Sequence, residues 1–252
     1  REMGKSEIEA FLSHLVMRLN VAASTQNQAF NAILFLYNHV LDVDMPEDIN
    51  ACRSKKPVRV PTVLARDETL KLIGAMTGTH QLMVKLMYGS GLRVIECIRL
   101  RIKDIDFQIN QIVVRDGKGK KDRITVFPDE IKPPLKEHLI YVRHLHERDL
   151  SKGFGRVYLP TALARKYKNA DKEWYWQYVF PAKTLSVDPR TRITRRHHIH
   201  VSSIQKAVKT AAKFSGIAKP VSCHTLRHSF ATDLLAGGYD IRTVQDSWGI
   251  KM

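Results

Sequence analysis

The chain has 252 residues, and its 41 Lys and Arg against 25 Asp and Glu give a formal charge of +16, so a nucleic acid is the leading partner class. With 44% hydrophobic and 26% charged residues the composition is globular, which excludes a disordered tail or a fibrous repeat. No apolar run approaches about 18 residues, the first residues are charged and the three cysteines lie far apart, so we expect a reduced, cytoplasmic protein without a membrane span, disulfide framework or zinc site.

Two amphipathic helices are predicted within the first 41 residues. Ser6 and Glu9 have the spacing of a capping box at the start of the first helix, and the second begins near Ser24 or Thr25. Two helices alone bury too little surface to be stable, so residues 1–48 are interpreted as part of a larger helical domain. The apolar residues with helical spacing are Ile8, Phe11, Leu12, Leu15, Val16 and Leu19 in the first helix, and Phe30, Ile33, Leu34, Tyr37 and Leu41 in the second.

Residues 49–62 are interpreted as a basic linker. This stretch is rich in proline and has no sustained periodicity. Its basic residues, among them Lys55, Lys56 and Arg59, would follow a nucleic-acid backbone electrostatically. Residues 63–252 then form a second domain.

The second domain is predicted to be mainly helical with a small antiparallel β-sheet. Helices are expected over DETLKLIGAM, over THQLMVKLMYGSG and from about Arg93. A β-hairpin follows, in which one strand alternates through Ile112 and Val114, GKGK supplies the turn, and the other strand alternates through Ile124 and Val126.

The rest of the domain contains three further helices and one irregular segment. A long polar helix is expected over KPPLKEHLIYVRHLHERDL, and residues 151–200 then carry Gly, Pro, aromatic and basic residues with little period. Helical order returns in VSSIQKAVKTAAKFSG and in CHTLRHSFATDLLAGG, whose final glycine pair lies where a helix should end.

Three short motifs hold the candidate chemistry. In HTLRH, His224 and Arg227 leave one face of a helix near its N-terminus, where the helix dipole favours an anion. Arg93 follows an apolar run and two glycines, which favours a position facing a cleft, and Glu96 would orient its guanidinium. Lys118 lies at the glycine-flanked hairpin tip, where it could donate a proton.

Each of these residues also has a plainer interpretation. H-x-x-R pairs are common on solvated helix faces, Glu96 would suit an exposed helix surface, and basic hairpin tips bind phosphate without specificity. Together, however, two arginines, one lysine and one histidine suit a pentacoordinate phosphoryl transition state with little need for a metal, because cations spread the developing charge and a proton donor frees the leaving 5′ oxygen. Such a site still needs a nucleophile.

The ordered strings GSGLRVIE, DGKGKKDR and HTLRHSFATDLLAGGYDIRTVQ resemble the catalytic domain of the tyrosine site-specific recombinases, the phage integrase family. The similarity runs from about residue 61 to 246, and the preceding helices resemble the family's SAM-like core-binding domain. The segment WYWQYVFPAKTLSVDPRTRITRRHHIH, within about 151–200, is similar to an insert of one branch, the integron integrases.

The resemblance implies a role for each candidate. Arg93 and Arg227 would clamp the scissile phosphate, His224 would assist them, Lys118 would be the general acid and Glu96 would buttress the arginines. It also implies strand exchange through a 3′-phosphotyrosyl intermediate, without metal, ATP or another cofactor. The family acts as a tetramer on DNA in the bacterial cytoplasm.

For the integron branch, the implied partners are a folded single-stranded cassette site and a double-stranded integron site. Trp176 and Pro189 would pack against a flipped base, and His197 and His198 would stack beside another, each stacked base contributing about 1–3 kcal/mol. The alternative interpretation makes Trp174 and Trp176 a local hydrophobic anchor of the insert.

The end of the sequence departs from the family pattern. The family continues with Leu-Leu-Gly-His and then the nucleophilic tyrosine, whereas this chain reads VQDSWGIKM, with Ile250 at the histidine position. Tyr239 is no substitute, because the family has a non-nucleophilic tyrosine there. We therefore expect a monomer that binds DNA without cleaving it. A frameshift, a fragment of a functional gene or true degeneration of the homologue would each explain this end. Coding DNA whose shifted frame does not spell Leu-Gly-His would contradict the frameshift.

Two alternative functions make different demands on the sequence. A catalytically dead DNA-binding module, acting as a regulator or competitor, would have no reason to keep all four catalytic candidates. A metal-dependent nuclease would need clustered carboxylates, and the nearest candidates, Asp104 and Asp106, have the positions of turn residues.

Overall fold

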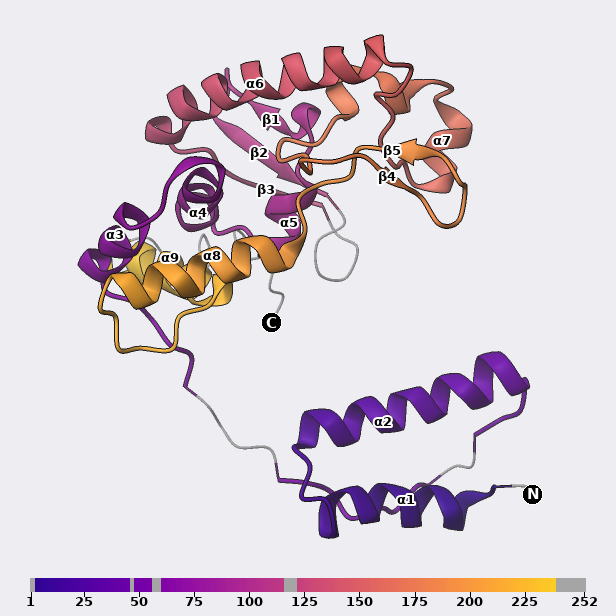
Figure 1. Cartoon of the computed structure of the whole chain (residues 1–252). Helices are drawn as coiled ribbons and strands as arrows, with labels where there is room; N and C mark the ends of the chain where they lie inside the picture. Colours follow the sequence, from indigo (N-terminus) through magenta and orange to yellow (C-terminus); the bar gives the residue numbers. More distant parts are fainter. Residues whose placement is uncertain (1–2, 46–47, 56–59, 116–121, 239–252) are drawn as a thin grey trace. The chain divides into compact units, whose positions relative to one another are not determined.

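The computed structural model divides the chain into two compact units, Arg1–Val60 and Pro61–Met252, which are described separately (Figure 1). It describes residues 3–45, 48–55, 60–115 and 122–238. Within those ranges, no helix is both long enough and apolar enough to cross a bilayer.

The first unit contains α1 (Lys5–Met17) and α2 (Ala23–Leu36), which continues into a π-helical turn, Tyr37–Leu41. Helix α1 starts earlier than the predicted capping box, because the carboxylate of Glu7 accepts a hydrogen bond from the Gly4 N–H at 2.9 Å. The predicted box between Ser6 and Glu9 is therefore wrong. The predicted apolar faces are also only partly buried, since Phe11, Leu19 and Leu41 are exposed.

A small core holds this unit together, formed by Ile8, Leu12, Tyr37 and Ala51. The buried amide of Gln26 donates to the carbonyls of Leu12 (3.1 Å) and Cys52 (2.6 Å). These bonds hold the segment after residue 48 against the two helices, so the first part of the predicted linker packs on this unit.

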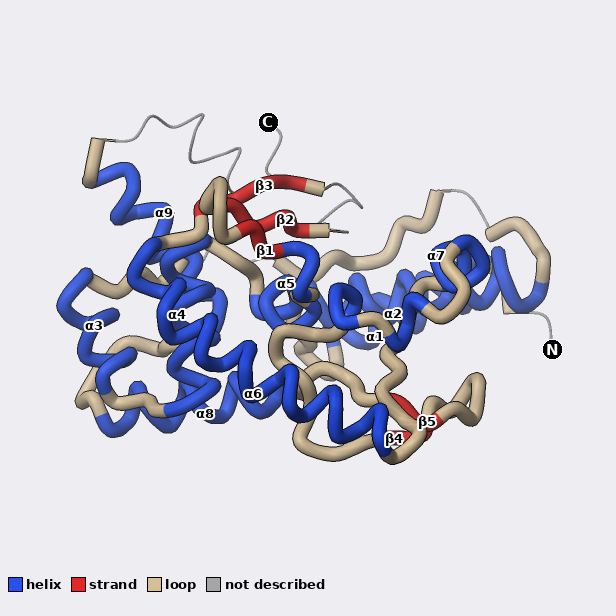
Figure 2. Tube along the Cα trace, turned by 90° about the horizontal axis from the view of Figure 1, so that it is seen from above, coloured by secondary structure: helices blue, strands red, loops and turns tan. Residues whose placement is uncertain are grey.

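The second unit is mainly helical with a small antiparallel sheet, as predicted. Its main core joins the helices to β2 and includes Met83, Met87, Ile112, Leu135 and Leu226, all fully buried. Figures 1 and 2 show α6 as a long helix that runs from beside α4 towards the hairpin of residues 186–195. The elements are α3 (Arg66–Gly74), α4 (Gly78–Ser90), α5 (Val94–Arg99), β1 (Ile105–Asp106), β2 (Gln111–Val114), β3 (Arg123–Val126), α6 (Lys132–Ser151), α8 (Val201–Phe214) and α9 (Cys223–Ala236), with short 3₁₀ turns at Ile102–Asp104 and Asp129–Ile131.

The turn between α4 and α5 depends on glycine. Gly91 has a φ of +59°, and a Cβ there would lie 2.6 Å from the ring of Phe230 on α9. The chain can therefore end α4 and approach α9 closely only without a side chain at this position. This close approach brings the start of α5 next to α9.

The hairpin strands face the core differently from the prediction. In β2, Ile112 and Val114 are buried, as the alternation indicates. In β3, however, Thr125 is buried and donates to the Ser90 carbonyl at 2.8 Å, while Ile124 and Val126 are 57% and 52% exposed. The predicted apolar face of β3 is wrong, because the polar residues of this strand face inward.

Residues 151–200, called the insert below, form a distinct layer with a small core of their own. This segment contains α7 (Thr161–Lys166), 3₁₀ turns at Ala170–Lys172 and Trp174–Trp176, and a two-stranded hairpin of β4 (Ser186–Val187) and β5 (Thr194–Arg195). A buried ion pair ties it to α6, because Arg196 Nη2 donates to Asp149 Oδ1 at 2.8 Å and Arg196 Nη1 donates to the Ala182 carbonyl at 2.7 Å. The core residues are Val157, Leu159, Ala170 and Tyr178.

Candidate functional site

Arg93 lies at the start of α5, where the sequence placed it. Its backbone N–H donates to Glu96 Oε2 and its Nη1 donates to Glu96 Oε1, both at 2.7 Å. One carboxylate three residues away thus caps the helix and orients the guanidinium.

His224 and Arg227 lie in the first turns of α9. Ser222 fixes the start of this helix, because its Oγ accepts from the N–H groups of His224 (3.2 Å) and Thr225 (3.3 Å). His224 is exposed and its ring meets that of His228 edge-on, with centroids 4.9 Å apart. Arg227 is 3% exposed and donates from Nη1 to the Gly91 carbonyl.

The structure brings the starts of α5 and α9 together. Arg227 Nη1 lies 3.9 Å from Glu96 Oε2, so the carboxylate that orients Arg93 is also an ion-pair partner of Arg227. The two guanidiniums, far apart in the sequence, therefore belong to one cluster with His224 at its edge. A doubly cationic site at two helix N-termini is suited to a phosphate dianion or diester.

A third arginine in this cluster was not identified from the sequence. Arg123, the first residue of β3, donates from Nη1 to Glu96 Oε1 and from Nη2 to Glu96 Oε2, both at 2.8 Å. Its side chain is 9% exposed. The only indication in the sequence is that Arg123 is two residues from Thr125 and so lies on the same face of the strand. The apolar residues Ile124 and Val126 suggest that the other face is the buried one.

The charges of the cluster shift its pKa values strongly. Burial by itself would raise the pKa of Glu96, but hydrogen bonds from Arg123 and Arg93 outweigh it and lower that pKa to about 2. Burial, followed by the charges of Arg93 and Arg123, lowers the pKa of Arg227 to about 10. Both groups thus remain charged at neutral pH. Burial and then the charges of Arg227 and Arg93 lower the pKa of His224, which favours its neutral form.

Several predicted site residues lie outside the described residues: Lys118, Lys56 and Arg59. Lys55 is described and exposed in the first unit. The carboxylates proposed for a nuclease have local roles. Asp104 accepts from Arg115 Nε at 2.8 Å, and Asp106 accepts from the N–H groups that follow it in its turn. No cluster of metal-ligating side chains occurs in the described ranges.

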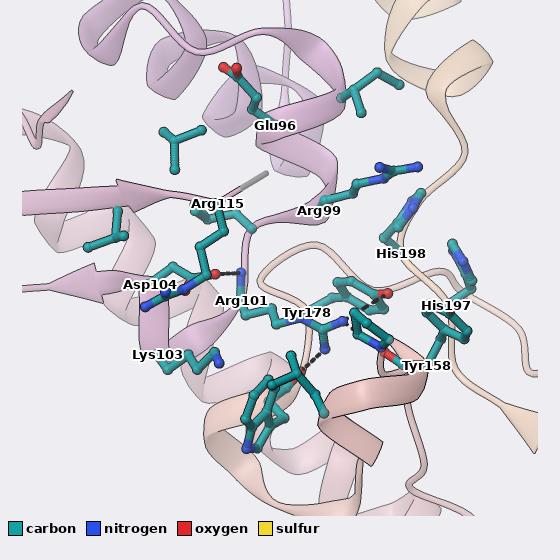
Figure 3. A pocket seen from close by; sticks show the side chains of 17 residues that line it. Glu96, Arg99, Arg101, Lys103, Asp104, Arg115, Tyr158, Tyr178, His197 and His198 are labelled. Atoms are coloured by element: carbon teal, nitrogen blue, oxygen red, sulfur yellow. Dashed lines mark hydrogen bonds and ion pairs between the residues drawn. The ribbon is translucent and has the colours of Figure 1, made fainter. Parts of the chain in front are cut away.

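A cleft of about 440 Å³ adjoins the cluster and shares Glu96 with it (Figure 3). It lies between α5, the end of β2 and the insert. Its lining combines four cations with aromatic rings: Arg99, Arg101, Lys103 and Arg115, together with Tyr158, Trp176, Tyr178, His197 and His198.

The two tryptophans of the insert have different surroundings. Trp174 packs against the main core, with the Arg143 guanidinium 5.3 Å from its ring centroid. Trp176 lines the cleft, and Lys103 Nζ lies 3.1 Å from its ring centroid. Arg101 lies 4.6 Å above the Tyr178 ring and donates to the Trp176 carbonyl at 2.5 Å. Trp174 thus packs on the main core and lines a surface pocket beside α6, whereas Trp176 packs on the small core of residues 151–200 and lines the cleft that contains Glu96.

The histidine pair lies beside Tyr158 and Tyr178, on the side of the cleft away from Asp104 and Lys103 (Figure 3). The ring centroids of His197 and His198 are 4.0 Å apart, and the ring centroid of His198 is 5.2 Å from that of Tyr178. Burial lowers the pKa of His198 to about 4, so this ring is neutral at physiological pH. Pro189 is exposed in the turn between β4 and β5 and is not among the residues that line the cleft. The structure brings three of the four predicted base-contacting residues together and leaves Pro189 apart.

Comparison with known structures gives the same fold. The chain aligns over 99% of its length with 75% of a XerA recombinase crystal structure, at 27% identity and a TM-score of 0.52. It aligns over its full length with 65% of a XerH site-specific recombinase bound to difH substrate, at 19% identity and a TM-score of 0.61, a likeness of fold.

Comparison of sequences shows the family. A curated "Integrase/recombinase" of Escherichia coli is 46% identical over 247 residues, which cover 98% of this chain and 73% of the relative, and a protein of the same description from Pseudomonas aeruginosa matches equally well. The model of the phage integrase family matches residues 62–251, and that of the phage integrase N-terminal SAM-like domain matches residues 1–47. The chain belongs to the phage integrase family, the tyrosine site-specific recombinases.

Proposed function

We propose that this chain is a site-specific DNA recombinase of the integron integrase type, in which Arg93, Arg227 and His224 hold the scissile phosphate. The observation that carries the proposal is the convergence of Arg93 and Arg227 on the carboxylate of Glu96. The likeness to XerH, whose structure contains its difH substrate, supports DNA as the partner. Such a reaction takes place in the bacterial cytoplasm.

In the proposed reaction a tyrosine oxygen attacks the phosphorus, a 3′-phosphotyrosyl bond forms, and the bond to the 5′ oxygen breaks. The two guanidiniums neutralise the charge that develops on the non-bridging oxygens. The lowered pKa of His224 favours its neutral form, whose ring N–H donates a hydrogen bond to one of these oxygens. Lys118 gives a proton to the leaving 5′ oxygen. The reverse steps join the phosphate to a new 5′ hydroxyl, so no metal or ATP is required.

The integron assignment is supported by the cleft beside the phosphate cluster. Aromatic rings on which a base can stack line it, and its four cations suit the adjacent backbone. We propose that an unpaired base of a folded single-stranded cassette site enters between Trp176 and the histidine pair. Pro189 has no part in this proposal, because it does not line the cleft.

The test adds a C-terminal segment that carries the nucleophilic tyrosine of the family pattern. The residues after Gln245 are replaced by the corresponding C-terminal segment of the E. coli relative, and the chimera is incubated with a nicked suicide substrate made from the relative's recombination site. We expect a covalent protein–DNA adduct on a denaturing gel, and no adduct from the same chimera with its added tyrosine changed to phenylalanine. A polypeptide of residues 1–252 should bind this DNA without forming an adduct.

The substrate form is tested with a matched pair of DNAs. One is a hairpin with unpaired bases and the other has the same sequence fully paired. The proposal predicts tighter binding of the hairpin. Absence of an adduct would favour the alternative of a catalytically dead DNA-binding module, and equal binding of both DNAs would contradict the integron assignment.

A further inference from the structure

The carboxylate of Glu96 is fully engaged by its neighbours. A carboxylate offers about four lone-pair sites for hydrogen bonds. In the described part of the chain, Glu96 accepts two bonds from Arg93, through its N–H and Nη1, and two from the guanidinium of Arg123. Each oxygen thus receives two donors at 2.7–2.8 Å. Arg227 Nη1 stays at 3.9 Å, beyond hydrogen-bond distance.

We infer that Arg123 is a positioning residue that fills the acceptor sites of Glu96 and so keeps Arg227, which donates to the Gly91 carbonyl, from moving into a hydrogen bond with this carboxylate. Its fork fills one site on each oxygen, which only a planar guanidinium can do. Without it, the buried carboxylate would have two unfilled acceptor sites and a second guanidinium within 4 Å. The inference rests on the proposed function, because it concerns the arginine pair proposed to hold the phosphate.

The position of Arg123 gives it a second effect on the same site. It is the first residue of β3, five positions after Lys118 in the sequence, and it donates to Glu96 on α5. The strand is also held at Thr125, which donates to the Ser90 carbonyl at the end of α4. Arg123 therefore joins the hairpin to the helix start where Arg93 is oriented.

The test uses residues 1–252 and inorganic phosphate as the probe. Binding is followed by NMR of the arginine side-chain nitrogens in wild type, Arg123→Gln, Arg123→Lys, Glu96→Gln and the double variant Arg123→Gln/Glu96→Gln. Lys132→Gln is the matched control, because it removes one cation that is paired with Asp129 beside the same sheet and belongs to neither the cluster nor the cleft. Thermal unfolding of each variant confirms that it is folded.

We expect phosphate binding to weaken about tenfold in Arg123→Gln and about fivefold in Arg123→Lys, against about twofold in Lys132→Gln. Glu96→Gln alone should weaken binding about threefold, because Arg93 loses the carboxylate that orients it, and the double variant should bind phosphate as Glu96→Gln does, since the competing carboxylate is gone. A lysine variant equal to wild type, a glutamine variant equal to Lys132→Gln, or a double variant weaker than both single variants would overturn the inference.

A crystal structure of Arg123→Gln, or of Arg123→Lys if the first does not fold, decides the inference independently of phosphate. We expect Arg227 Nη1 to move from 3.9 Å to hydrogen-bond distance of Glu96. An unchanged distance overturns the inference. Failure of the wild type to bind phosphate would count against the proposed function alone, because this distance would still report on Arg123.

Discussion

The phosphate cluster and the insert cleft lie side by side but are built differently. Three charged side chains of the cluster are almost fully buried: Glu96, Arg123 and Arg227 are 7%, 9% and 3% exposed, whereas Arg93 is 22% exposed. Arg123 on β3 donates to Glu96 on α5, and Arg227 on α9 donates to the Gly91 carbonyl at the end of α4. The cleft is lined by aromatic rings and cations, several of them on a segment with its own small core. Under the proposed function, this difference would separate a rigid site for one phosphate from a surface that can accept different bases.

The largest effect is expected in the cluster. Arg227→Ala in the tyrosine-bearing chimera should reduce the rate of adduct formation about 10³-fold, because it removes donors from the developing negative charge and leaves Glu96 less compensated. Single-turnover cleavage measures this rate. Lys213→Gln, an exposed change on α8, is the control and should stay within about twofold. A loss below about tenfold would contradict the assigned role of Arg227.

The next effect concerns the junction of the insert with α6. Arg196→Met should lower the free energy of unfolding by about 3–5 kcal/mol, because it leaves the buried carboxylate of Asp149 unpaired. Arg196→Met/Asp149→Leu should recover much of this loss, since no charge then remains buried. Urea unfolding measures both variants. If the double variant is no more stable than the single one, the ion pair does not explain how the insert is held.

A third prediction separates the cleft from the cluster. Trp176→Ala should weaken binding of a hairpin with unpaired bases by about 5- to 150-fold, the range expected for loss of one stacked base, and leave the fully paired duplex unchanged. Fluorescence anisotropy measures both affinities. Tyr175→Ala is the matched control, since this neighbouring ring is exposed and does not line the cleft. Equal losses on both DNAs would place Trp176 outside base recognition.

The smallest effect is a pH dependence of stability caused by Glu96. Its pKa is lowered to about 2 in the folded protein from an ordinary value of 4.5. The group therefore stabilises the fold above about pH 4.5, and this contribution is lost as the pH falls towards 2. Denaturant unfolding from pH 6 to pH 2 should show a loss about 1–3 kcal/mol greater in wild type than in Glu96→Gln. Parallel curves would contradict the lowered pKa.

The sequence predicted the parts of the site that depend on local spacing. Arg93 and Glu96 are three residues apart, as are His224 and Arg227, and helical geometry alone places each pair on one face. Arg123 was missed because alternation defines two faces of a strand without saying which is buried, and Ile124 and Val126 pointed to the wrong one. Pro189 was assigned by resemblance alone, and the structure places it in the exposed turn between β4 and β5, outside the lining of the cleft.

The sequence by itself thus determined the family, the helices and the local pairs, because these follow from ordered motifs and from interactions within one turn of chain. Tertiary structure alone decided that one carboxylate serves three arginines and that Trp176 rather than Trp174 lines the cleft that contains Glu96. Both outcomes depend on contacts between distant segments. They follow from the close approach of α4 and α9 at Gly91 and from the packing of the insert on α6, which periodicity does not encode.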